Sequence, residues 1–374
     1  MNRFIELTKL DLISDNLNIN LKICNIMLNT ALKQLFKNLF LNTDISTELL
    51  IVDSNVEQEK PFSKAIQRLT KAKIDKNDEF YTQLNDVNNE LRHYKDHFKD
   101  KTILCNCDDE SSAFWEYFHL NFNFFGMKKL ISTHYDREKP TYKVEYTGGI
   151  DTDLQDRILT PLKGNGDFRN KESIELLQEA DIVVTNPPFS LFREYIAQLM
   201  EYNKKFIIIG SQNAIKYKEV FPLLKDNKIW LGYGSNLSMV FKTPYPNLLE
   251  DNRKFVISKG YDPDDGYVKT PGVSWFTNLE HTKRHEKLIL WATYNPDDYP
   301  KYDNYNAIEV KKVELIPEDY FDEMGVPITF MDKYCPEQFE IVGGYNYSTG
   351  TDGKPWNAKI NGKYVYARIL IKRK

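Results

Sequence analysis

Residues 181–189 read Asp-Ile-Val-Val-Thr-Asn-Pro-Pro-Phe, a hydrophobic strand that runs directly into a rigid turn. The three β-branched residues at 182–184 are typical of a central parallel strand that is covered on both faces. Pro187 favours an extended backbone at Asn186, and Pro187 and Pro188 both have a fixed φ and no N–H. The chain therefore leaves the predicted strand stiffly, at the sheet edge where open α/β sheets bind ligands.

The turn at 186–189 carries groups suited to holding a planar nitrogen base. The side-chain carbonyl of Asn186 and the backbone carbonyl after it are two acceptors for the two hydrogens of an aromatic amine. This grip leaves the amine lone pair free to attack a methyl donor. The ring of Phe189 offers a stacking face, a contact worth about 1–3 kcal/mol per base. The competing interpretation is a proline-rich loop with Phe189 in the core. We predict a catalytic group formed by Asn186, Pro187, Pro188 and Phe189.

Strand-like and helical segments alternate around this stretch. Strands are predicted at 102–107, 129–133, 181–185, 205–210 and 228–233. Helices are predicted at 79–97, 111–125, 170–179, 190–202 and 214–225, the second with Ser111 or Ser112 as its N-cap. This alternation predicts an α/β fold with a doubly wound, mainly parallel sheet.

The 374 residues divide into three parts by pattern. Residues 1–60 are predicted to form an N-terminal helical extension and linker, because 26–41 places apolar residues at helical spacing. The alternating segments make 61–233 the predicted catalytic domain. The alternation ends near residue 234, and 234–374, rich in Tyr, Asn, Asp, Gly and Pro, is predicted to be a loop-rich recognition region.

Composition narrows the classes of protein. With 41% hydrophobic residues a sizeable core is expected, and the formal net charge of −4 means that a nucleic-acid partner needs a local basic surface. No segment approaches about 18 uninterrupted apolar residues, so no membrane span is expected. Four cysteines without disulfide-rich spacing favour the cytoplasm. The i,i+4 pairs His93/His97 and His281/His285 lack a third ligand, so no metal site is predicted.

Three further segments supply candidates for a methyl-donor pocket. DEFYT at 78–82 opens the first predicted helix, and its aromatic and hydroxyl groups suit a methionine-like moiety. NCDD at 106–109 ends the first strand, and GNGDF at 164–168 precedes the 181–185 strand, with an acid and a ring suited to adenine. Each motif is weak alone, but their order around one sheet strengthens the prediction. The candidate cofactor-binding residues are Phe80, Tyr81, Thr82, Asn106, Asp108, Asp167 and Phe168.

Together these motifs resemble the EcoRI-type adenine-specific DNA methyltransferases. The resemblance runs from about residue 62 to the C-terminus and includes GDFR at 166–169, DIVVTNPPFSLFREYI at 181–196, KIWLG at 228–232 and RILIK at 368–372. It implies a Rossmann-like class I methyltransferase fold, S-adenosylmethionine as donor, and methylation of N6 of an adenine flipped out of double-stranded DNA. It also implies a restriction–modification system, with a cognate endonuclease acting on the same site.

The chain departs from the pattern of methyltransferases in two places. NCDDESS replaces the usual glycine-rich loop after the first strand, and the usual acid after the second strand is not evident, although Tyr135 and Asp136 lie nearby. An RNA or protein-glutamine methyltransferase is the alternative enzyme, because the NPPF turn also marks those classes. A non-enzymatic DNA-binding module is the alternative without catalysis. Candidate phosphate contacts include Lys216, Lys218, Lys283, Arg284 and the basic C-terminus 372–374.

Overall fold

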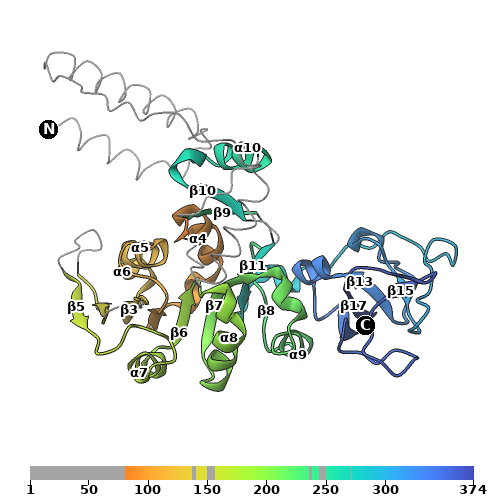
Figure 1. Cartoon of the computed structure of the whole chain (residues 1–374), viewed down its shortest axis with the longest axis horizontal. Helices are drawn as coiled ribbons and strands as arrows, with labels where there is room; N and C mark the ends of the chain where they lie inside the picture. The colour runs from red at the N-terminus through yellow and green to blue at the C-terminus, as the bar shows by residue number, and fades with distance from the viewer. Residues whose placement is uncertain (1–80, 137–139, 150–155, 236–237, 244–249, 271) are drawn as a thin grey trace, which may run out of the picture. The chain divides into compact units, whose positions relative to one another are not determined.

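An eight-stranded sheet in the order β5-β4-β3-β2-β6-β7-β11-β8 forms the centre of the structure (Figure 1). The structure is a computed structural model, and it describes residues 81–374 except 137–139, 150–155, 236–237, 244–249 and 271. The predicted N-terminal extension 1–60 and the candidate Phe80 lie outside the described residues.

Four parallel strands form the middle of this sheet. They are β3 (Lys129–Thr133), β2 (Thr102–Cys105), β6 (Ile182–Thr185) and β7 (Lys205–Ser211), in that spatial order. Because β2 pairs with β3 on one side and with β6 on the other, the chain changes direction across the sheet at β2. A crevice is expected at such a topological switch point, outside the carboxyl ends of β2 and β6.

Antiparallel strands complete the sheet on both sides, so the predicted mainly parallel sheet is correct at its centre and mixed at its edges. β4 (Tyr142–Tyr146) and β5 (Ile158–Pro161) extend it beyond β3, while β11 (Val273–Thr277) pairs with both β7 and β8 (Trp230–Leu231). β4 and β5 were not predicted, since their polar edge segments lack a continuous apolar run. β11 comes from the predicted recognition region, so that region also contributes to the central sheet.

Helices cover both faces of the sheet (Figure 1). One face carries α4 (Leu84–Leu91), α5 (Ala113–Leu120) and α6 (Phe122–Phe125), and the other carries α7 (Lys171–Glu179), α8 (Phe192–Glu201) and α9 (Phe221–Lys225). In β6, Ile182 and Val184 pack with the α4–α6 side and Val183 packs with the α7–α9 side. Successive strand residues point to opposite faces, so two covered faces bury all three β-branched residues.

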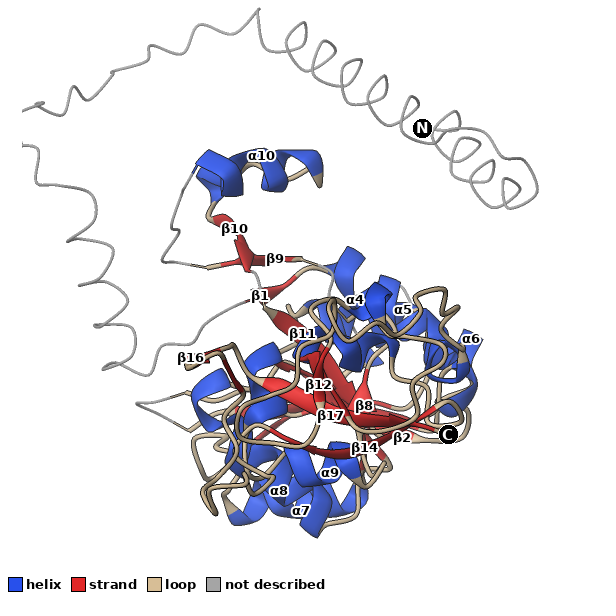
Figure 2. Ribbon diagram, turned by 90° about the vertical axis from the view of Figure 1, so that its right-hand side faces the viewer, coloured by secondary structure: helices blue, strands red, loops and turns tan. Residues whose placement is uncertain are grey.

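Smaller sheets and short helices make up the remaining described chain. β1 (Tyr81–Thr82), β9 (Met239–Lys242) and β10 (Tyr267–Thr270) pair antiparallel, with α10 (Glu250–Ser258) beside β10 (Figure 2). A C-terminal sheet has the order β12 (Ile308–Glu309), β13 (Met324–Pro327), β17 (Arg368–Arg373) and β14 (Phe339–Gly344), and a hairpin joins β15 (Lys359–Ile360) to β16 (Lys363–Tyr364). The 3-10 helices are η2 (Arg92–His97), η4 (Phe189–Leu191), η5 (Gln212–Lys216), η6 (Pro263–Asp265), η7 (Thr282–His285), η8 (Val313–Leu315) and η9 (Ile328–Lys333).

The start of the first predicted helix is wrong. Tyr81 and Thr82 form a strand instead, because they pair with Lys242 and Phe241 of β9. The helix begins only at Leu84. A partner strand so far along the chain overrides the local helical pattern, as tertiary context commonly does.

Gly210 of β7 tests how tightly this core is packed. An added Cβ would lie 2.4 Å from a ring carbon of Phe192, a fully buried residue of α8. We expect Gly210→Ala to destabilise the protein by about 1–3 kcal/mol through overpacking, measured as a lower urea midpoint. Gly210→Ala combined with Phe192→Leu should recover part of that loss relative to Phe192→Leu alone. An unchanged midpoint in the single variant would contradict this packing.

Candidate active site

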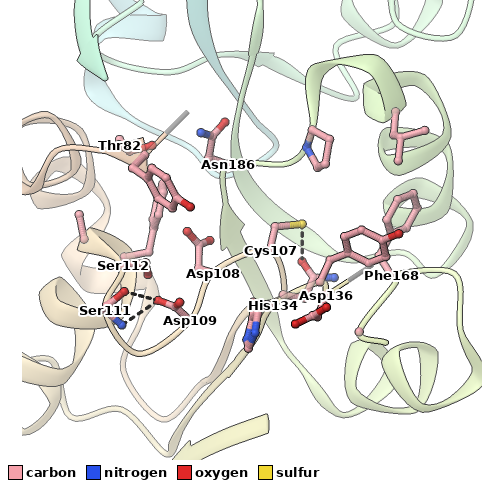
Figure 3. A pocket seen from close by; sticks show the side chains of 18 of the residues that line it. Thr82, Cys107, Asp108, Asp109, Ser111, Ser112, His134, Asp136, Phe168 and Asn186 are labelled. Carbon is pink, nitrogen blue, oxygen red and sulfur yellow. Dashed lines mark hydrogen bonds between the residues drawn. The ribbon is translucent and has the colours of Figure 1, made fainter. Parts of the chain in front are cut away.

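A cavity of about 1100 Å³ lies at the switch point of the sheet. Its walls come from the chain after β2, β3 and β6, from β1 and β9, and from the loop before α7. Figure 3 shows side chains from several of these segments converging on one space. The cavity is slightly larger than the roughly 300–1,000 Å³ usual for small-molecule sites, so it has room for a nucleotide-sized ligand.

Most predicted site residues meet at this cavity. The ones that line it are Tyr81, Thr82, Asn106, Asp108, Asp167, Phe168, Asn186 and Pro188. The other two described candidates, Pro187 and Phe189, are not among the lining residues. Pro187 is buried, and Phe189 is partly buried and packs against the α4–α6 core. The functional role assigned to each residue remains a prediction.

Asp108 connects the two strand ends that flank the switch point. Its Oδ2 accepts a hydrogen bond of 2.5 Å from the hydroxyl of Thr185, at the end of β6. The Asn186 backbone amide and the Ser112 hydroxyl also donate to this carboxylate. On the opposite side, the Asp108 amide donates to the Thr133 carbonyl of β3 at 3.0 Å. Burial raises the pKa of Asp108 to about 7. The nearby Asp109 raises this pKa as well, whereas the hydrogen bonds to Asp108 lower it.

The NCDDESS segment forms a polar turn at the N-terminus of α5. Ser112 accepts a hydrogen bond of 3.1 Å from the Trp115 amide, which confirms the predicted N-cap. Asp109 accepts from the Ser111 amide at 2.8 Å and from its hydroxyl at 2.6 Å. Carboxylates are favoured at a helix N-terminus. Side-chain hydrogen bonds therefore order this segment, where many methyltransferases use glycines.

Two buried polar atoms in the cavity wall lack a hydrogen-bond partner among the described residues. They are Oγ1 of Thr82 and Nδ2 of Asn106. The other amide atom of Asn106 accepts from the Tyr195 hydroxyl, which fixes the orientation of the amide. Buried polar atoms nearly always have partners. These two atoms therefore fit a bound ligand. Such a ligand would accept a hydrogen bond from the Asn106 amide and would donate to or accept from the Thr82 hydroxyl.

The loop before α7 approaches the cavity through a glycine. Gly166 has φ of +77°, and a Cβ there would lie 1.9 Å from the carbonyl oxygen of His134. The Asp136 amide also donates to the Asn165 carbonyl at 2.9 Å. The loop thus lies directly against the chain that follows β3. His134, Tyr135 and Asp136 line the cavity, so both residues named near the end of the second predicted strand lie at the site.

Arg169 orients the predicted adenine motif. Its Nε and Nη2 donate to the two oxygens of Asp167 at 2.9 and 2.6 Å, and its Nη1 donates to Glu194 of α8 at 3.0 Å. The guanidinium also lies 5.2 Å from the centre of the Phe168 ring. That ring is 5% exposed and packs edge-on against Tyr195. Asp167 is therefore held in one orientation, and Phe168 presents a small part of its surface to the cavity.

Lys242 also lines the cavity, although no sequence motif predicted it there. It belongs to β9, where its register partner is Tyr81 of β1. Its ammonium also lies 5.4 Å from the ring centre of Tyr267. Only the pairing of β1 with a strand from the region after residue 234 brings this cation to the cavity, and no local periodicity reports such a pairing.

The described residues contain no group of three or more His, Cys, Asp or Glu side chains that could hold a metal ion. Within the same part of the chain, the helices are too short or too polar to cross a bilayer. His281 is buried, and its Nε2 lies 2.9 Å from the Leu231 carbonyl oxygen.

Comparisons with known proteins identify the class. The family described as adenine-specific methyltransferase EcoRI matches residues 68–374. The type II methyltransferase M.EcoRI of Escherichia coli is 46% identical over 323 residues, covering 82% of this chain and 96% of the relative. M.MpnI of Mycoplasma pneumoniae is 38% identical over 321 residues, or 81% of this chain and 97% of the relative. No solved structure matches.

The chain therefore belongs to the EcoRI family of adenine-specific methyltransferases, which confirms the predicted resemblance. A third relative, M.MgeORF184P of Mycoplasma genitalium, is 38% identical over 325 residues, covering 82% of this chain and 99% of its own. The methyl donor of this family is S-adenosylmethionine, as predicted. The cavity fits it, because Thr82, Asn106 and several acids offer hydrogen-bonding groups for its adenosine and methionine parts.

The unsatisfied hydroxyl of Thr82 leads to a prediction with opposite signs in two assays. Thr82→Val should leave thermal stability without ligand unchanged or slightly raised, because it removes a buried unpaired group. It should weaken S-adenosylmethionine binding about 5–10-fold, the loss of one hydrogen bond, measured by calorimetry.

Thr277→Val is the matched control. Thr277 is also buried, but its hydroxyl donates to the Phe206 carbonyl at 2.7 Å and accepts from the Leu279 amide at 3.0 Å. This variant should lose stability and keep its donor affinity. Equal donor affinity in the Thr82 variant and the wild type would exclude Thr82 from the binding site.

Proposed function

We propose that this chain transfers a methyl group from S-adenosylmethionine to the N6 amine of an adenine in double-stranded DNA, as the modification enzyme of a type II restriction–modification system. One observation carries the proposal. The Asn186 turn and the candidate donor-binding residues line the same cavity, in a chain that belongs to a family of adenine-specific methyltransferases. The cognate partner would be an endonuclease that cuts the same site.

The catalytic turn is built to hold an amine rather than to take its proton. When bound, the donor supplies a methyl group already activated on a sulfonium, so the protein need not form a covalent intermediate. Asn186 and the Pro187 carbonyl hold the amine hydrogens and leave its lone pair free. The fixed φ of the prolines and the Thr185–Asp108 hydrogen bond stiffen this turn. Little freedom is then lost when the base arrives.

The target adenine must leave the DNA stack to reach the turn. Flipping costs a few kcal/mol, and stacking on Phe189 offsets part of that cost. Because Phe189 packs against the α4–α6 core, its ring is already held before the base binds. A ring that is held in place has less rotamer entropy to lose on stacking.

We assign target recognition to the region after β11, residues 278–374, and retain 61–233 as the catalytic part together with β9, β10 and β11. Some predicted phosphate contacts are already engaged within the protein: Lys283 pairs with Asp332 at 2.7 Å, and Arg284 pairs with Glu280 at 2.5 Å. Lys216 is a better candidate. It donates to the hydroxyl of Tyr366 at 3.0 Å, and Tyr366 is 60% exposed.

Incubation with labelled S-adenosylmethionine and DNA, RNA or protein separates this proposal from its alternatives. Label in N6-methyladenine of duplex DNA supports it. Label in RNA or in protein glutamine supports the other enzyme classes, and DNA binding without label supports a non-enzymatic module.

Asn186→Ala should abolish methylation of DNA while donor affinity stays within about twofold of the wild type, because the turn holds the acceptor rather than the donor. Methyl incorporation and calorimetry measure the two effects. Asn89→Ala, on the exposed side of α4, is the control and should keep normal activity. Near-normal methylation by the Asn186 variant would refute the role assigned to the turn.

A further inference from the structure

Asp108 is shared between the donor cavity and the catalytic turn. Its side chain lines the cavity and points toward Asn186 in Figure 3. The same carboxylate accepts from the Thr185 hydroxyl at 2.5 Å and from the Asn186 backbone amide. A change of charge on Asp108 therefore alters the hydrogen bonds that hold the residue proposed to grip the target base.

We propose that Asp108 is a positioning residue. The positive charge of the bound methyl donor favours its ionised form, and the ionised carboxylate then holds the Asn186 turn more firmly. This inference rests on the proposed function. The donor carries a sulfonium cation, whereas the sulfur of the product S-adenosylhomocysteine is neutral. A nearby cation favours the ionised carboxylate, and an ionised acceptor forms the stronger hydrogen bonds. The turn is then held firmly with the donor bound and loosely with the product bound.

Among the nearest titratable groups, Asp108 is the one whose protonation a bound cation can change near pH 7. Burial raises the pKa of the Cys107 thiol and of the Tyr195 hydroxyl on α8, so both stay neutral near pH 7. The carboxylate of Asp109 adds to the raised pKa of Asp108. Glu116 of α5 also lines the cavity.

The charges across the cavity also favour a cationic ligand. His134 and Asp136 follow β3, Asp167 is paired with Arg169, and Lys242 projects from β9. Carboxylates thus outnumber Lys and Arg side chains among the described lining residues, and of Arg169 and Lys242 the arginine is paired with an acid. His134 is the one imidazole among the described lining residues, so it receives its own control.

Cation binding to a protonated Asp108 releases its proton to the solvent. Because burial raises the pKa of Asp108 to about 7, the group is mostly protonated at pH 6 and mostly ionised at pH 8. Donor binding should therefore release close to one proton at pH 6 and almost none at pH 8.5. Donor affinity should rise roughly tenfold between pH 6 and pH 8, the ratio of ionised fractions at a pKa of about 7.

Calorimetry in two buffers of different ionisation enthalpy measures this proton release. S-adenosylmethionine and S-adenosylhomocysteine are each titrated into the wild type, Asp108→Asn, Asp109→Asn and His134→Gln. The Asp109 variant removes the same charge one residue away, from a group bonded to Ser111 instead of the turn. The amino group of each ligand titrates alike in every variant, so the differences between proteins isolate the side chain.

We expect the Asp108 variant to lose the donor-specific release and the His134 variant to keep it. The Asp109 variant should keep the release but show it at lower pH, because the Asp109 carboxylate raises the pKa of Asp108. Equal release by donor and product, or release retained in Asp108→Asn, would overturn the inference. If Asp108→Asn does not fold, Thr185→Val replaces it. Removing that hydroxyl donor raises the pKa of Asp108 further, so the release should move to higher pH, and an unmoved profile would count against the inference.

Hydrogen exchange of residues 182–190 reports on the turn itself. The prolines lack amides, so exchange near the turn comes mainly from Thr185, Asn186 and Phe189. At pH 7 this segment should be better protected with the donor than with the product in the wild type, and equally protected in Asp108→Asn. Adenine methylation without proton linkage would overturn this inference alone. Proton linkage without adenine methylation would overturn the proposed function alone.

Discussion

Four parallel strands are buried on both faces, and this burial decides where functional groups can lie. A strand covered on both sides can offer functional groups only at its ends. Since β3 and β6 flank β2, the helices after β2 and β6 turn to opposite faces, and a crevice opens between the two strand ends. The Asn186 turn and the NCDD segment therefore share one site, although they are far apart in the chain.

The polar groups at these strand ends are held by one another as much as by the core. Asp108 accepts a hydrogen bond from Thr185, Asn106 accepts one from the Tyr195 hydroxyl, and Asp167 accepts from Arg169. A buried carboxylate whose pKa is about 7 contributes little to stability, because burial penalises its charged form. Local rules of stability are commonly broken at functional sites, and this cluster fits that pattern.

Local patterns predicted what local physics decides. Runs such as 182–184 and 129–133 identified the buried strands, and prolines and glycines identified the rigid turns. The sequence could not show that Tyr81 and Thr82 form a strand, because their partner β9 lies far along the chain. The same long-range pairing brings Lys242 to the cavity. Arg169 belongs to the GDFR motif at 166–169, but only the geometry shows that it orients Asp167.

The C-terminal sheet shares a hydrophobic core with the eight-stranded sheet, and under the proposed function this core constrains how DNA binds. Phe221 of α9 stacks on Tyr347 with ring centres 4.4 Å apart, and Leu224, Ile341 and Ile369 belong to one buried cluster. Domains joined by a polar interface move by default, whereas a hydrophobic one resists such motion. Closure of residues 278–374 over the cavity would expose this core. Under the proposed function, the target base would therefore move to the Asn186 turn by base flipping.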